Sequence, residues 1–286
     1  MVNVKVKELK QRRCKLVIEE ATPYFVNSLR RVLLSEVPKM AIDDVILYDN
    51  NSGLFDEIVA HRVGLLPVPT DLNLFKFRKE CVCEGKGCQN CTIRFTLSKE
   101  GPGTVFSRDL QPDNPAYAIA DPNIPIVELL KGQRLILEAE AILGVGRDHA
   151  KWQVSSGVGY KYHPIVKVNN GQIQNADAIA KSCPVDVFEA HKGELQVVRE
   201  EACILCNACV EKDAETQGKS VKRDGDEARS PGVTIRGDPT RFIFKFETDG
   251  SLKPDVALLK AVEIMKNRLN EFEEKALKLK VMEAEV

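Results

Sequence analysis

The clearest periodic pattern lies in residues 22–38, TPYFVNSLRRVLLSEVP, where apolar side chains recur every three or four positions. That spacing places them on one face of a helix. Thr22 can cap the first turn, Pro23 suits the first helical position, and Pro38 prevents continuation beyond Val37. The pattern therefore predicts an amphipathic helix whose apolar face is buried, either on its own domain or on a partner.

Alternating apolar and polar residues predict strands on both sides of this helix. Residues 2–20 contain two short alternating runs separated by KQRR, which is typical of a β-hairpin. Residues 40–50 predict a strand, residues 54–66 a short helix, and residues 92–146 a β-rich stretch. Two sets of alternating side chains mark strand faces, namely Leu135, Leu137, Ala139 and Ala141 in one strand and Phe242, Phe244 and Phe246 in another.

The final segment, which opens with Ser251 and Pro254, predicts a long helix with an apolar seam. Its apolar side chains alternate spacings of four and three residues, as in a heptad repeat. The seam consists of Leu258, Val262, Met265, Leu269, Phe272 and Ala276. A seam of this length suits packing against one other helix, in the same chain or in a partner.

Composition narrows the class of protein. The chain is 43% hydrophobic and 29% charged, and no apolar run approaches the roughly 20 residues that span a bilayer. The start, MVNVKVKELK, alternates apolar and charged residues and does not resemble a secretory signal, so we expect a cytoplasmic protein of two or three modules. A net charge of −1 lacks the basic excess of an autonomous nucleic-acid-binding protein, so we expect contact with DNA to be indirect.

Four of the nine cysteines lie within KECVCEGKGCQNC. Cys81, Cys83, Cys88 and Cys91 form a C-x-C-x4-C-x2-C group, which we call the cysteine knuckle. Four thiolates around glycine turns suit a closed, structural zinc site without an open position for catalysis. Two local disulfides, or a knuckle that has lost its metal, are the alternatives. Cys14 stands apart, and its strand pattern predicts a buried, inert thiol.

A second cysteine set has the spacing of a bacterial-type ferredoxin. Cys203, Cys206 and Cys209 follow C-x2-C-x2-C, and Cys183 precedes a proline, which together supply one ligand set for an iron–sulfur cluster. Zinc bound by the same four cysteines is the alternative. The positions where a second cluster would have its ligands carry no cysteine, and they are Ile173, Ala176, Ile179 and Asp213. The pattern therefore predicts a ferredoxin unit that keeps one cluster.

Three blocks carry a family resemblance. NSLRRVLLSEVP, MAIDDVILYDN and LFDEIVAHRVGLLPV, in this order, resemble the amino-terminal domain of RNA polymerase alpha-type subunits, most closely the archaeal branch known as D. GVGRDHAKW, at residues 144–152, is similar to the same branch. The resemblance implies an α+β fold: an alpha-subunit-like dimerisation domain (residues 1–38 and 222–286) interrupted by a β-rich insert domain (39–165) and a ferredoxin-like α+β module (166–221).

The resemblance also implies partners and cofactors. It implies a non-catalytic assembly platform of a DNA-dependent RNA polymerase that pairs with the small L subunit, docks onto the large catalytic B subunit and contacts the small N and P subunits. It further implies one [4Fe-4S] or [3Fe-4S] cluster, with zinc in the knuckle. The interface residues so implied are Phe25, Asn27, Leu29, Arg30, Arg31, Leu33, Leu258, Val262, Met265, Leu269 and Phe272. A ferredoxin-like electron carrier or a redox sensor is the rival interpretation, and it leaves the Arg30-Arg31 helix and the seam unexplained.

Overall fold

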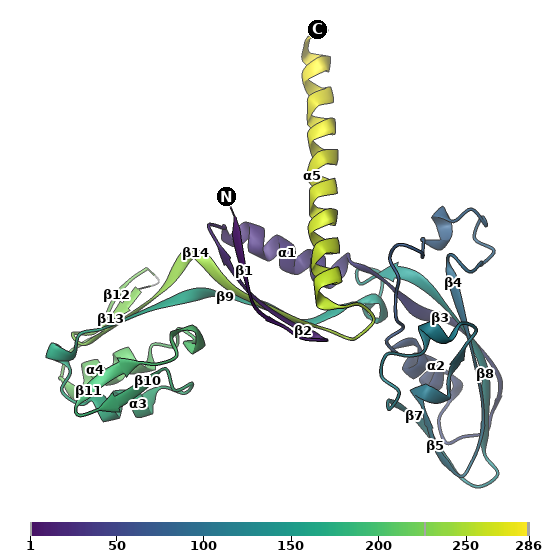
Figure 1. Ribbon diagram of the computed structural model, residues 1–286, viewed down its shortest axis with the longest axis horizontal. Coiled ribbons are helices and arrows are strands. Elements are labelled where there is room, and N and C mark those ends of the chain that lie inside the picture. The colour runs from purple at the N-terminus through teal and green to yellow at the C-terminus, as the bar shows by residue number, and fades with distance from the viewer. Residues whose placement is uncertain (1, 226, 285–286) are drawn as a thin grey trace. The chain divides into compact units, whose positions relative to one another are not determined.

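The computed structural model of the protein describes residues 2–225 and 227–284 (Figure 1). The chain divides into two compact units. The first unit contains the chain up to Lys7, then Lys15–Val26 and Gly159–Lys245. The second contains Glu8–Cys14, Asn27–Val158 and the residues from Phe246 on. Each unit is therefore assembled from segments that are far apart in sequence.

The predicted amino-terminal hairpin is confirmed. Strands β1 (Asn3–Leu9) and β2 (Arg13–Glu19) are neighbours in a six-stranded sheet, and the Lys10 N–H donates to the Arg13 carbonyl in the turn. The sheet order is β1-β2-β14-β13-β12, with β9 (Ser155–Val168) also paired to β14 (Val233–Thr248). The short strands β12 (Lys222–Asp224) and β13 (Glu227–Arg229) form its far edge. The three alternating phenylalanines of β14 are fully buried, as predicted.

Helix α1 (Pro23–Ser35) begins where the sequence predicts. The Phe25 N–H donates to the Thr22 hydroxyl at 3.3 Å, so the expected cap is present. The helix ends at Ser35, before Pro38, which opens strand β3 (Pro38–Asn50). Its buried side chains are Val26, Leu29, Val32 and Leu33.

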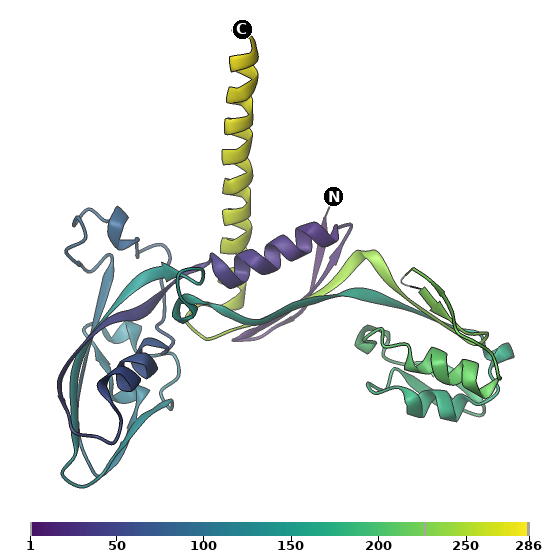
Figure 2. The same ribbon diagram turned by 180° about the vertical axis from the view of Figure 1, so that it is seen from behind.

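The β-rich segment folds into a second sheet in the order β3-β8-β4-β6. Figure 2 shows this part of the chain from behind. Strand β8 (Arg134–Val145) is central, flanked by β3 and β4 (Thr92–Glu100), and β6 (Gln111–Pro112) lies at the edge. Leu137 of β8 faces Leu47 and Leu97 in the neighbouring strands, which fixes the register of the apolar face. Helix α2 (Asp56–Gly64) and the ribbon of β5 (Gly103–Phe106) and β7 (Pro125–Leu129) contribute to the same core.

Short 3₁₀ turns connect these elements. They are η1 (Arg78–Glu80), η2 (Ser107–Asp109), η3 (Pro115–Tyr117), η4 (Ala150–Trp152), η5 (Asn170–Gln172) and η6 (Glu200–Ala202). The η4 turn follows the GVGRD segment, so the sequence there forms a turn. Strand β9 passes through residue 165, where we expected the insert domain to end.

Residues 176–197, around Cys183, form a helix followed by a strand hairpin. Helix α3 (Ala176–Ser182) is followed by β10 (Phe188–His191) and β11 (Glu194–Val197), and α4 (Ala208–Thr216) lies beside α3 (Figure 1). The core of this module includes Ile179, Val187 and Val210 together with Ile235 of β14. The ferredoxin-like elements thus pack on the end of the first sheet.

Helix α5 (Pro254–Ala284) ends the described chain. Its seam is partly covered at Leu258 and Met265, whereas Leu269 and Phe272 are 68% and 72% exposed. The described chain has no helix that is both long enough and apolar enough to cross a membrane.

Candidate functional site

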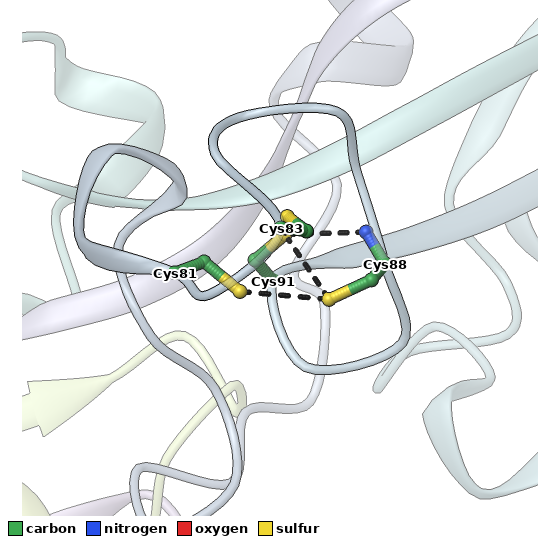
Figure 3. A group of neighbouring side chains, drawn as sticks. All are labelled: Cys81, Cys83, Cys88 and Cys91. Carbon is green, nitrogen blue, oxygen red and sulfur yellow. Dashed lines mark hydrogen bonds between the residues drawn. The ribbon is translucent and has the colours of Figure 1, made fainter.

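The four knuckle cysteines converge on one point (Figure 3). Their sulfur atoms lie within 4.8 Å of one another, with Cys81 and Cys88 separated by 3.5 Å, Cys83 and Cys91 by 3.5 Å, and Cys88 and Cys91 by 3.9 Å. A tetrahedral zinc ion with Zn–S bonds of about 2.3 Å separates its sulfur ligands by about 3.8 Å. All four thiols are free, and their separations far exceed a disulfide bond of about 2.05 Å. The geometry therefore suits one metal ion.

Tight turns bring the two halves of the knuckle together. Gly85 and Gly87 have φ angles of +83° and +85°, the left-handed region that favours glycine. Arg78, which precedes the first cysteine, donates from Nη2 to a carboxylate oxygen of Glu140 at 2.9 Å. Glu140 belongs to the central strand β8, so this ion pair fastens the knuckle to the sheet.

Two thiols of the knuckle have pKa values shifted in opposite directions. A hydrogen bond from the Cys83 backbone N–H lowers the pKa of Cys81, but desolvation and hydrogen bonds with the other thiols outweigh it and raise that pKa to about 12. Desolvation raises the pKa of Cys83, but hydrogen bonds from Cys91, Cys81 and the Gly87 backbone lower it to about 6. Hydrogen bonds among the four inward-pointing thiols thus move the pKa values of Cys81 and Cys83 in opposite directions.

The ferredoxin cysteines are also brought together. Cys183, Cys203 and Cys209 are buried in one core, whereas Cys206 is exposed. Burial, followed by the charges of Cys203 and Cys183, raises the pKa of Cys209 to about 12, and the charge of Cys206 contributes to the same shift. The charges of the other three thiols thus act on Cys209, although the sulfur atoms of this set are not gathered as tightly as those of the knuckle.

The backbone around these cysteines is shaped as a cradle. The cluster loop, Cys203 to Cys209, has Leu205 and Asn207 in the left-handed conformation at φ +59° and +64°. The Leu205 N–H points to the Cys203 sulfur at 3.4 Å, and the Val187 N–H points to the Cys183 sulfur at 3.4 Å. Backbone N–H groups that donate to cysteine sulfurs are one of the features that tune iron–sulfur sites. The residues present fit a cluster.

The positions of the missing second cluster are packed. Ala176 and Ile179 are buried in the module core, and Ile173 packs against the same core. The Asp213 carboxylate is fully buried and accepts hydrogen bonds from the Ser230 hydroxyl at 2.6 Å and from the Gly232 N–H at 2.8 Å. These four positions thus contribute apolar packing and one buried, hydrogen-bonded carboxylate.

The structure separates the predicted interface residues of α1 by exposure. Leu29 and Leu33 are 3% and 1% exposed, so their side chains pack within the chain itself. Arg30 is partly buried, and its Nε and Nη2 atoms donate to the Asn27 side-chain oxygen at 3.1 and 2.9 Å. Arg31 is exposed, and Phe25 is half-buried. Of the two arginines, Arg31 is the one free to reach a partner.

The sequence did not indicate how α1 and α5 are joined. Glu36, just after α1, accepts an ion pair from Arg147 at 2.9 Å and another from Arg268 of α5. In α5, Arg268 adjoins the seam residue Leu269, so this pair fixes the rotation of the seam.

The sequence also did not indicate the contacts that hold the segment from Cys203 to Cys209 in place. Lys161 donates from Nζ to the carbonyls of Glu201 and Cys203, both at 2.7 Å. The Glu201 carboxylate pairs with Lys7 of β1 at 2.7 Å and with Lys15 of β2 at 3.3 Å. Residues so distant in sequence give no local signal of this contact.

With this geometry in hand, the comparisons with known proteins identify the class. Residues 42–160 match the family model of the RNA polymerase Rpb3/RpoA insert domain. This match, on a mixed α/β fold of several sheets, defines an alpha-type RNA polymerase subunit and confirms the predicted fold class.

Relatives over nearly the full length specify the family. The chain is 41% identical to DNA-directed RNA polymerase subunit Rpo3 of Picrophilus torridus, covering 92% of this chain and 95% of the relative. It is 36% identical to Rpo3 of Methanosphaera stadtmanae (93% and 96%) and 38% identical to Rpo3 of Archaeoglobus fulgidus (95% and 96%). The chain belongs to the Rpo3 family, the alpha-type, non-catalytic subunits of archaeal RNA polymerase.

Proposed function

We propose that the chain is the assembly platform of an archaeal DNA-directed RNA polymerase, pairing with the small L subunit through α1 and α5. The observation that carries this proposal is the exposed apolar seam of α5. Leu269 and Phe272 present large apolar side chains to solvent, and Glu36 holds their helix against the end of α1. Exposed apolar side chains at heptad spacing are stabilised by a facing helix.

We assign docking onto the large catalytic B subunit to Arg31. The small N and P subunits are the further partners that we propose. An exposed guanidinium suits a charge-assisted contact to a carboxylate of the larger subunit. Arg30 supports this surface through its bonds to Asn27.

The seam is tested by co-expression with the L subunit. Leu269→Asp places a charge in the seam and should abolish co-purification of L. Asn270→Asp adds the same charge at the next exposed position, outside the seam, and should leave co-purification intact. Retention of L by the Leu269 variant would remove the proposal, as would equal loss in the two variants.

Zinc is the metal that the knuckle suits, because four thiolates at these separations match its tetrahedral preference. Cys81, Cys83, Cys88 and Cys91 would hold it, and it would cross-link the loop before β4. One zinc per chain, measured by elemental analysis, is the expected result. Cys88→Ser should lose it while the sheet remains folded.

An iron–sulfur cluster held by Cys183, Cys203, Cys206 and Cys209 completes the proposal, with a mainly structural role. When bound, the cluster supplies four thiolate bonds that order the module. The ion pairs of Glu201 with Lys7 and Lys15 tie the cluster loop to the first hairpin. Ordering of the loop is thereby linked to the sheet whose strand β2 leads into α1.

Cys206→Ser tests the role of the cluster. The side chain is exposed, so the substitution should remove the brown chromophore without disturbing the core. We expect faster proteolysis of the module and weaker incorporation into polymerase, with binding of L retained. Cys14→Ala, at the buried thiol outside both sets, is the control. Unchanged proteolysis and incorporation would contradict a structural role, and reversible redox cycling that alters assembly would favour a sensor.

A further inference from the structure

A hollow lined by cations lies beyond the end of α4, where the chain continues from Gly218 towards β12. Its volume is about 790 Å³. The polar side chains around it are Gln172, Lys219, Ser220, Lys222, Arg229 and Ser230. Among the residues that the structure describes, the lining contains three cations and no carboxylate. Every charged group that the structure describes in this lining is therefore positive.

The cations continue along the sheet. Arg229 also lines a neighbouring hollow of about 190 Å³ with Lys167, Arg236 and one acid, Glu227. In the register of the strands, Lys222 faces Arg229, and Arg229 faces Thr234. We call Lys167, Lys219, Lys222, Arg229 and Arg236 the basic track.

The other side of the same strands is apolar. Ala228, Val233 and Ile235 are buried in the core of the ferredoxin-like module. Because successive side chains of a strand point to opposite faces, this burial directs the cations of β13 and β14 outward. The module core thus holds the basic track as a fixed row on the surface.

The track has little internal charge compensation. Arg229 reaches its acid, Glu227, only at 3.9 Å, and Lys219 donates to a neutral partner, the Gln217 side chain, at 3.4 Å. Within residues 2–225 and 227–284, Lys167, Lys222 and Arg236 form no ion pair. By contrast, Lys7 of the same unit pairs with Glu201 at 2.7 Å. Cations left unpaired in a row are available to an external anion.

We propose that the basic track binds the phosphate backbone of a nucleic acid. Backbone phosphates are recognised by lysine, arginine, serine and amide donors, which are the groups present. The donors are exposed and spread over four strands and a loop, which suits an extended polyanion better than a single small anion. An acidic polypeptide fits less well, because the track offers few apolar anchors of the kind that dominate protein interfaces.

This inference goes beyond assembly, which needs no contact with nucleic acid. The net charge of −1 does not oppose it, because binding follows the local distribution of charge. The expectation of purely indirect contact with DNA rested on that net charge alone.

The test is fluorescence anisotropy of a short fluorescein-labelled DNA duplex with the purified full-length chain over a range of salt concentrations. Lys222→Glu combined with Arg229→Glu should weaken binding at least about tenfold. The slope of log K against log salt should fall by about 2, since each phosphate contact contributes about 0.9. Lys131→Glu combined with Lys181→Glu makes the same change in charge at exposed positions outside the track and should leave the slope unchanged.

Three outcomes would overturn the proposal. These are unchanged binding in the track variant, equal loss in both double variants, and normal DNA binding with failure of the track variant to join polymerase. The last result would assign the track to an acidic polypeptide. If the double variant with glutamates misfolds, the test is repeated with Lys222→Gln combined with Arg229→Gln, which removes the charges without reversing them. Pairing with the L subunit, measured in parallel, reports separately on the proposed function and should persist in all variants.

Discussion

Lys39 forms an ion pair with Asp249 although its own side chain is only 2% exposed. Lys39 is the second residue of β3, and Asp249 follows β14, so the pair joins two segments separated by 210 positions. Asp249 also accepts hydrogen bonds from the backbone and hydroxyl of Ser251. The charge of the buried Lys39 ammonium is thus compensated by the Asp249 carboxylate, which its hydrogen bonds to Ser251 hold in place.

Asp249→Asn should therefore strongly destabilise the chain. The amide retains an oxygen for Ser251 but leaves the buried Lys39 charge unpaired, a loss of about 3 to 5 kcal/mol. The midpoint of urea unfolding measures it. Glu247→Gln, which breaks the exposed pair with Arg13, is the control and should cost less than about 1 kcal/mol. Equal changes in the unfolding midpoint of the two variants would show that burial of Lys39 does not add to the stability of its ion pair.

Gly87→Ala should damage the knuckle more than Gly85→Ala. Both positions have positive φ, so both substitutions introduce left-handed strain of about 1 to 2 kcal/mol. A Cβ on Gly87 would also lie 2.7 Å from Nη2 of Arg78, whereas nothing lies within 4 Å at Gly85. Displacing Arg78 from Glu140 should loosen the loop. Zinc affinity, measured by competition with a chromophoric chelator, distinguishes the two variants, and equal affinities would refute the role of Arg78.

Glu140 should give the insert domain an acid-sensitive stability. Desolvation raises its pKa, but hydrogen bonds from Arg94 and Arg78 outweigh this and lower it. A carboxyl with a lowered folded pKa stabilises the fold above its unfolded value, about 4.3, and loses that contribution as pH falls through the folded pKa.

The difference in unfolding midpoint between the parent and Glu140→Gln should therefore be largest near neutral pH and vanish in acid. Urea unfolding from about pH 7 to about pH 3 measures it. Glu128→Gln, at an exposed carboxylate of β7, should show no such change. A gap that persists at the lowest pH would contradict the electrostatic explanation.

Arg31→Ala should weaken docking to the large subunit while leaving pairing with L intact. Loss of a buried charge-assisted contact in the complex costs about 1.5 to 3 kcal/mol. Arg30→Ala should weaken docking less than Arg31→Ala does, because the Arg30 guanidinium already donates to Asn27 within the helix. Titration of the purified heterodimer with the large subunit gives both affinities. Unchanged docking of the Arg31 variant would exclude the assigned contact.

The sequence by itself determined the features that local rules control. Thr22, Pro23 and Pro38 bound α1 through capping and backbone restriction, and the structure confirms the helix that they predict. Cysteine spacing was similarly informative, because a knuckle of eleven residues must converge if its turns are tight. The alternating phenylalanines of β14 gave the buried strand face for the same reason: periodicity is a local property.

Only the tertiary structure decided which of these residues face outward and which distant groups meet. Periodicity placed Leu29 and Leu33 on an apolar face, but packing shows that the chain itself covers them and leaves Leu269 exposed. No local pattern pairs Lys39 with Asp249, or aligns Lys167 with Arg229, because those contacts arise when strands from separate segments enter one sheet. The physical reason is that burial and charge proximity depend on through-space neighbours, which chain order does not specify.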